Sequence, residues 1–112
     1  MDFALTPEQH LFDATLRGYL AEHLPVERLR ALTDTGTGFD EPLWQGLCEL
    51  GLQGLLVPER FGGSGLGVTE AAIMMQEIGH SAGAFAACSA VHINIFGLHA
   101  IVKHGSSRQR TA

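Results

Sequence analysis

Residues 55–67 read Leu55-Leu56-Val57-Pro58-Glu59-Arg60-Phe61-Gly62-Gly63-Ser64-Gly65-Leu66-Gly67, an apolar run followed by a Pro-Glu turn and a glycine cluster. Four glycines fall within residues 62–67, so this backbone needs positive φ angles or lies very close to a neighbour. The sequence on both sides is apolar and helix-forming, which argues against a flexible linker. The stretch therefore predicts a shaped loop between two helices, with an extended segment at 55–57.

Helical patterns cover most of the remaining chain. The segment Thr6-Pro7-Glu8-Gln9 has the spacing of a capping box with proline at the first helical position, and an apolar stripe follows it to His23. Asp40 and Gly51 are expected to cap the two ends of a third helix. The predicted helices cover residues 7–23, 26–32, 41–50, 68–78 and 83–102. The segment 83–102 is expected to be either one helix or two helices separated near Gly97. A further helix is expected to begin at Ser106. This pattern predicts an all-α fold, a helical bundle of about five to six helices with a glycine-rich loop.

The composition limits the function classes. The 112 residues make one domain or a piece of one; 17% are charged and the net charge is -5. Nucleic-acid binding relies on Lys and Arg that neutralise phosphates, so this acidic chain argues against it. Cys48 and Cys88 lie in apolar helical contexts and are expected to be buried free thiols of an intracellular protein. The N-terminus shows no secretory signal, and we expect a cytoplasmic location.

One segment is long enough to span a membrane. Residues 81–102 contain no formally charged side chain. The same segment carries His92, Asn94 and His99, which are costly against lipid and need hydrogen-bond partners. We therefore favour a buried helix of a globular protein, with no membrane partner.

The sequence contains no visible catalytic constellation. The glycine loop misses the dinucleotide-binding pattern because Val68 stands where the third glycine belongs, and it lacks the ending of a P-loop. A structural or partner-facing turn is therefore favoured over a phosphate cradle. The six histidines never form a pair with helical zinc-ligand spacing, and we expect no metal site.

Two pairs of residues have a structural interpretation. Glu70 and Glu77 lie seven residues apart in one predicted helix and can share a face, and solvated helix charges are the expected state of such a pair. Tyr19 and Trp44 fall at the spacing of core positions and are expected to be packing residues.

The sequence resembles the N-terminal helical domain of the acyl-CoA dehydrogenase family. The order and spacing of several segments carry this resemblance over nearly the whole chain. These segments are Phe3 to Gln9, Leu50 to Gly67, Glu70 to Gly79, His92 to Asn94, and Ile101 to Ser106.

The resemblance implies a three-domain enzyme in which residues 1–112 form the N-terminal α-helical domain. The middle β-domain and the C-terminal α-domain are absent from this chain. The resemblance further implies FAD, held mainly by those two domains and a neighbouring subunit and not by this domain alone. The full-length protein is then expected to be a homo-oligomer, a dimer or tetramer, that desaturates an acyl-CoA or acyl-carrier-protein thioester and passes electrons to an acceptor. The chain alone is expected to be inactive.

By the same resemblance, this domain contributes one wall of an acyl cavity. The acyl-pocket residues are expected to be Ala86, Ala87, Ala90, Val91 and Asn94, and the loop residues near the substrate cleft Phe61, Gly62, Gly63 and Gly65. The small alanine side chains let other groups approach this helix closely. Packing of the alanines against neighbouring helices is the alternative, and no catalytic residue is expected in this chain.

Two other functions stay open from the sequence. The first is a non-enzymatic helical module that binds a partner or oligomerises through an exposed apolar face. The second is a small carrier of acyl groups, which would bind a fatty acyl chain by itself.

Overall fold

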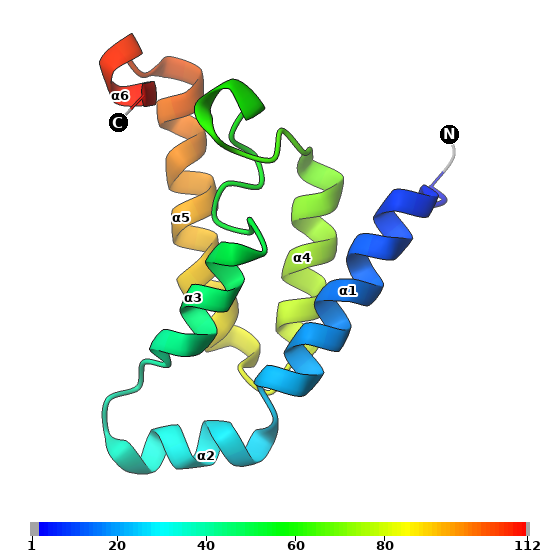
Figure 1. The fold of residues 1–112 in the computed structure, drawn as a ribbon, viewed down its shortest axis with the longest axis vertical. Coiled ribbons are helices and arrows are strands. Elements are labelled where there is room, and N and C mark those ends of the chain that lie inside the picture. The colour runs from blue at the N-terminus through cyan, green and yellow to red at the C-terminus, as the bar shows by residue number, and fades with distance from the viewer. Residues whose placement is uncertain (1–2, 112) are drawn as a thin grey trace.

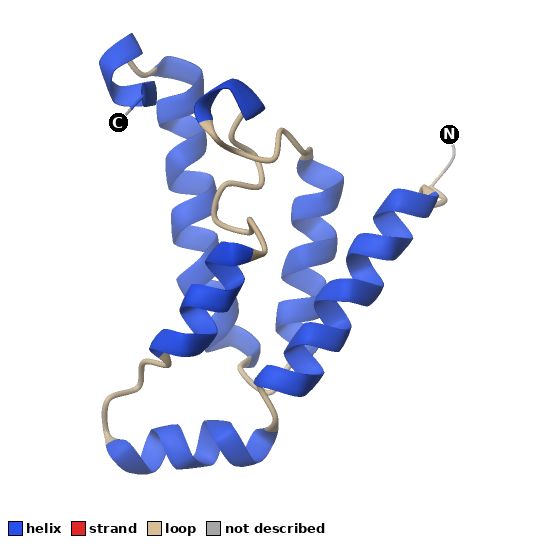
Figure 2. Cartoon of the chain, viewed as in Figure 1, coloured by secondary structure: helices blue, strands red, loops and turns tan. Residues whose placement is uncertain are grey.

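The computed structural model describes residues 3–111, and helices account for most of them (Figure 1). Within these residues there is no strand (Figure 2), which confirms the all-α prediction. The elements are α1 Pro7–His23, α2 Val26–Thr35, α3 Glu41–Glu49, the 3-10 turn η1 Glu59–Phe61, α4 Val68–His80, α5 Ala84–His104 and α6 Ser107–Thr111.

The helices pack in a simple order. α1 packs along α4, and α4 packs along α5. α2 lies across one end of the molecule and joins α1 to α3 (Figure 1). One apolar core links α1, α3, α4 and α5 and also takes in the segment between α3 and η1. Its buried members are Leu16, Leu20, Leu47, Leu52, Leu55, Ala71, Met74, Ile78, Val91 and Ile95.

The N-termini of α1 and α4 are tied together. Thr6 and Gln9 form the predicted capping box: the Gln9 amide donates to Thr6 Oγ1 at 3.2 Å, and the Thr6 amide donates to Gln9 Oε1 at 2.9 Å. Gln9 Nε2 also donates to Glu70 Oε1 at 2.7 Å, while Glu70 Oε2 accepts from the Gly67 amide at 2.9 Å. One glutamine thus serves its own helix cap and the cap of a helix 61 residues away in sequence.

The predicted cap at the start of α3 is present. Asp40 Oδ1 accepts from the Leu43 amide at 3.0 Å. Arg28 of α2 donates to both oxygens of the same carboxylate, at 2.6 and 2.7 Å. Asp40 therefore fixes the beginning of α3 and its position relative to α2.

The end of α3 is a Schellman motif. Gly51 has a φ of 78°, and its amide donates to the Cys48 carbonyl at 2.9 Å. The Leu52 amide donates to the Leu47 carbonyl at 3.2 Å, and both leucine side chains are buried in the core. Glycine is required at position 51 by this left-handed conformation, as the sequence predicted.

Two local predictions need correction. Residues 53–56 form turns, so an extended segment at 55–57 was wrong. The Leu55 and Val57 carbonyls accept hydrogen bonds from Leu66 and Gly65, so this segment folds back onto the glycine cluster. Between the two alternatives for the long apolar segment, α5 is one unbroken helix through Gly97.

α5 is less covered than the sequence predicted. Val91 and Ile95 are buried, but Phe85 is 85% exposed and Ile93 is 65% exposed. Among the described helices α5 alone is long and apolar enough to cross a membrane, by length and composition. A buried helix was therefore wrong for this chain taken alone, because only part of the α5 surface faces the other helices.

Candidate functional site

An apolar hollow lies between α2, α3 and the first turns of α5, with a volume of about 150 Å³. Its lining is Leu24, Leu29, Leu32, Gly38, Phe39, Asp40, Leu43, Trp44, Leu47, Gly83, Ala86, Ala87, Ala90 and Val91. Concave sites of this composition are the usual binding places for apolar groups.

One wall of the hollow is the alanine-rich face of α5. Ala86, Ala87, Ala90 and Val91 all line it, so the structure brings together four of the five predicted acyl-pocket residues. Ala86 and Ala90 are exposed, one helical turn apart, and Val91 is buried. Asn94 does not line the hollow, and its side-chain amide donates to the Ala90 carbonyl at 2.9 Å. The assignment of these residues to an acyl pocket stays a prediction.

The opposite wall comes from α3 and the segment before it. The rings of Phe39 and Trp44 meet at a centroid distance of 6.3 Å and an angle of 51°. Sequence reasoning assigned Trp44 to packing; it is half-buried against the core and also borders the hollow. Its place in the hollow was missed because the hollow is lined by segments more than 40 residues apart in sequence, which no local pattern records.

The hollow presents no uncompensated charge. Asp40 is the one ionisable residue in its lining. Both of its oxygens are bonded to Arg28, and one also accepts from the Leu43 amide. The hydrogen bonds from Arg28 hold the pKa of Asp40 below its ordinary value, so it stays ionised and paired. The free surface of the hollow is therefore suited to apolar groups.

The backbone amides of the glycine loop form hydrogen bonds within the loop and its flanking residues. The amides of residues 62, 63, 64, 65 and 66 donate to the carbonyls of Glu59, Pro58, Gly54, Val57 and Leu55 in turn, at distances between 2.8 and 3.3 Å. A Cβ added at Gly63 would overlap the carbonyl of Val57, which explains the need for glycine there. Because these amides are occupied, the loop offers no cradle for a phosphate.

The loop and the hollow are separate within this chain. None of the predicted loop residues lines the hollow, and the loop lies at the opposite end of the molecule from α2 (Figure 1). These residues are Phe61, Gly62, Gly63 and Gly65. Gly65 instead borders a shallow depression with Glu59 and Arg60. The placement of the loop near a substrate cleft stays a prediction.

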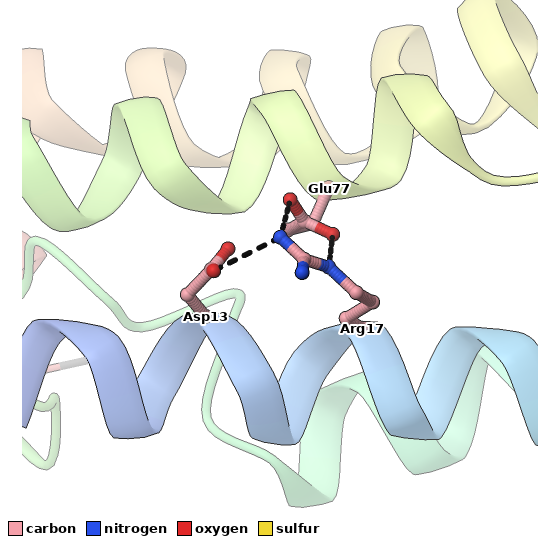
Figure 3. Close-up of polar contacts among 3 residues, drawn as sticks. All are labelled: Asp13, Arg17 and Glu77. Carbon is pink, nitrogen blue, oxygen red and sulfur yellow. Dashed lines mark hydrogen bonds and ion pairs between the residues drawn. The ribbon is translucent and has the colours of Figure 1, made fainter.

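A charged cluster joins α1 to α4 (Figure 3). Arg17 donates to both carboxylate oxygens of Glu77, at 2.9 and 3.0 Å, and to Asp13 Oδ2 at 3.0 Å. Glu77 is only 3% exposed, so solvation of this carboxylate was a wrong prediction. The hydrogen bonds from Arg17 lower the pKa of Glu77 against the opposing effect of burial. Glu77 does share a face with Glu70, since both bind side chains of α1.

The cysteines and histidines do not form a reactive centre. Cys48 and Cys88 are free and half-buried, not fully buried as predicted. Cys88 Sγ donates to the Met75 carbonyl at 3.4 Å, and burial raises the pKa of this thiol, which disfavours the nucleophilic thiolate. The residues described by the structure contain no group of three or more His, Cys, Asp or Glu that could hold a metal ion.

The sequence is similar to known proteins over most of its length. Residues 6–112 match the family model described as "Acyl-CoA dehydrogenase, N-terminal domain". The chain is 36% identical over 80 residues, 69% of its length, to "Acyl-CoA dehydrogenase IpdE2" of Mycobacterium tuberculosis. It is 31% identical over 110 residues, 98% of its length, to "Acryloyl-CoA reductase (NADH)" of Anaerotignum propionicum. It is 32% identical over 108 residues, 95% of its length, to the mitochondrial isovaleryl-CoA dehydrogenase of Bos taurus.

The chain spans about a quarter of each of these relatives, 25%, 27% and 25% of their lengths respectively. No solved structure matches the chain significantly.

Proposed function

Since the chain belongs to the acyl-CoA dehydrogenase family, as its N-terminal domain, we propose that it is the N-terminal part of an FAD-dependent enzyme that desaturates acyl thioesters between Cα and Cβ. In this proposal the helical domain supplies one wall of the acyl pocket and part of the subunit core. The catalytic base lies outside these 112 residues.

The apolar hollow beside α5 is the observation that carries this proposal. Its lining includes Ala86, Ala87, Ala90 and Val91 and contains no unpaired charge. Each methylene buried against such a wall contributes about 0.8 kcal/mol, so the wall binds and orients an acyl chain by contact alone. The relatives named above have names that refer to acyl-CoA compounds, which supports a thioester substrate.

In this proposal FAD is not held by this chain alone. The amides of the glycine loop are engaged with the loop's own carbonyls, so they are not free to hold a pyrophosphate. The proposal therefore assigns FAD to other parts of a longer protein or to a neighbouring subunit. A bound flavin supplies hydride acceptance. The residues of this chain hold the acyl chain and keep water away from it.

Further parts of the proposal concern partners and location. We include an acyl-CoA or acyl-carrier-protein thioester as substrate, an electron acceptor, and a homo-oligomer, either a dimer or a tetramer. The location in this proposal is the cytoplasm. The chain alone has no dehydrogenase activity in this proposal, because it lacks both the base and the flavin site.

The experiment begins with the intact mass of the protein isolated from its own cell. A mass several times 12.0 kDa, a flavin absorbance spectrum, and bleaching of that spectrum by an acyl-CoA under anaerobic conditions are the expected results. A purified protein that carries no flavin and reduces no artificial electron acceptor with any acyl-CoA would contradict the proposal.

The exposed face of α5 favours a second candidate, a helical interaction or oligomerisation module. Phe85 and Ile93 are largely exposed, and Phe96 and Ile101 are 48% and 39% exposed. A large exposed apolar surface drives association. Sedimentation velocity of the 112-residue chain over a wide concentration range tests this candidate, and a stable monomer throughout would exclude it.

A further inference from the structure

We propose that the hollow between α2, α3 and α5 is a terminal subsite that selects acyl groups ending in a compact apolar unit of about six carbons, such as a phenyl ring or a branched alkyl end. This inference rests on the proposed function and adds the substrate class. Ala86 and Ala90 are the specificity-determining residues in its lining, and Trp44 lies in its far wall.

The volume of the hollow determines the size of the apolar group that fills it. Its volume is about 150 Å³. An engineered apolar cavity of about 150 Å³ in another protein stays dry and binds benzene. A six-carbon unit therefore fills the hollow, whereas a two-carbon end would leave most of it without contacts.

The lining of the hollow favours an apolar group over a charged one. Apart from Asp40, the residues that border the hollow are aliphatic, aromatic or glycine, and the Asp40 carboxylate is already bonded to Arg28 and to the Leu43 amide. A terminal carboxylate on the acyl chain would lose its water there beside the negative charge of Asp40, and the indole N–H of Trp44 is the one neutral side-chain donor in the lining. The subsite therefore rejects acyl groups with carboxylate ends.

The lining residues of the hollow differ in how accessible they are. Ala86 and Ala90 are exposed one turn apart on α5 and line the hollow, so an incoming chain can reach its lining at these two residues. At Gly83 the packing is tight, because an added Cβ would lie 2.7 Å from Ala87 Cβ and 2.9 Å from Leu24 Cδ2. The lining is thus accessible at Ala86 and Ala90 and tightly packed beside Gly83.

Trp44 makes this subsite directly observable, since it is the single tryptophan of the chain. The probes are 3-cyclohexylpropanoyl-CoA and 3-phenylpropanoyl-CoA, whose six-carbon rings lie beyond Cα and Cβ, with free CoA and succinyl-CoA as controls. We expect both apolar probes to change the Trp44 emission and to bind the 112-residue chain at least about tenfold more tightly than either control, because each buried methylene is worth about fourfold. Equal responses to free CoA and to the apolar probes would overturn the subsite.

Matched variants locate the binding. Ala90→Leu adds three carbons where Ala90 lines the hollow and is expected to weaken 3-phenylpropanoyl-CoA binding at least about tenfold. Ala100→Leu makes the same change at an exposed α5 position outside the hollow and is expected to leave binding within about twofold. Ala86→Leu replaces Ala90→Leu if circular dichroism shows that the latter is unfolded. Unchanged binding in a folded Ala90 or Ala86 variant would overturn the subsite.

Activity of the longer protein separates this inference from the proposed function. We expect Ala90→Leu to lower the ratio of kcat/KM for 3-phenylpropanoyl-CoA over butanoyl-CoA at least about tenfold. Flavin reduction with an unchanged ratio would overturn the subsite and leave the proposed function standing. No flavin reduction by any thioester, together with an Ala90-dependent Trp44 response, would overturn the proposed function and leave a subsite for apolar groups.

Discussion

Arg17 on α1 and Glu77 on α4 form a fork of two hydrogen bonds, Nε to Oε2 at 2.9 Å and Nη2 to Oε1 at 3.0 Å (Figure 3). The Glu77 side chain is 2% exposed, while that of Arg17 is 63% exposed. An arginine that reaches inward from the surface thus neutralises a carboxylate that would otherwise be buried without a partner. Because the fork has a defined plane, it also fixes the rotation of α1 relative to α4.

We expect Glu77→Gln to lower the free energy of unfolding by about 1–2 kcal/mol, because one hydrogen bond to Arg17 is lost and an amide group is placed against the guanidinium. The loss stays below that of a fully buried pair since Arg17 remains largely hydrated. Urea unfolding at pH 7 measures it. Glu22→Gln, at an exposed position of α1, is the control and should stay within about 0.5 kcal/mol of the parent. Equal midpoints for the two variants would contradict this account.

The same ion pair predicts how stability depends on pH. The pKa of Glu77 is lowered by Arg17, so its stabilising contribution is complete above the unfolded pKa of about 4.3 and is lost as the pH falls through the folded pKa. Asp40 behaves in the same direction because Arg28 lowers its pKa. Unfolding midpoints in urea from pH 7 to pH 3 should fall less steeply for Glu77→Gln than for the parent. Parallel curves would show that Glu77 has no part in the acid sensitivity.

The helix ends could be predicted because their chemistry is local. The capping box of Thr6 and Gln9 and the cap at Asp40 need partners only three residues away, which a sequence displays directly. The left-handed conformation at Gly51 likewise follows from glycine at the end of an apolar helical pattern. The resemblance named five acyl-pocket candidates, and four of them line one wall of the hollow.

The long-range partners could not be predicted. Glu77 looks like any helix carboxylate until Arg17, 60 residues earlier, is brought against it. Residues 55–57 read as an extended run because their hydrogen bonds to residues 65 and 66 depend on the path of the loop. The position of Trp44 across the hollow from α5 depends on how the fold places α3 and α5, which lie far apart in sequence. In each case a contact between segments distant in sequence determines the structure. Composition and hydrophobic periodicity carry no information about such contacts.

A third prediction concerns Gln9, which links the caps of α1 and α4. Gln9→Ala removes the bond to Glu70 and one half of the Thr6 capping box, so we expect a loss of about 1–2 kcal/mol in the free energy of unfolding. Gln45→Ala changes an exposed glutamine of α3 and serves as the control. Hydrogen exchange should also quicken in the first turns of both α1 and α4. Faster exchange in α1 alone would mean that the two caps are independent.

A fourth prediction separates two glycines that look equivalent in composition. Gly63→Ala places a Cβ against the Val57 carbonyl, so the loop must shift and break the hydrogen bonds that close it; we expect a loss of about 2 kcal/mol or more. Gly18→Ala adds the same methyl to a position of α1 with nothing within 4 Å, and we expect a gain of about 0.5–1 kcal/mol from helix propensity. Thermal unfolding of both variants tests this prediction. Gly63→Ala should lower the unfolding temperature and Gly18→Ala should raise it if the fold of residues 55–67 requires glycine at position 63. A neutral Gly63→Ala variant would mean that the loop is free to move, and the occupied amides would then no longer argue against a phosphate site there.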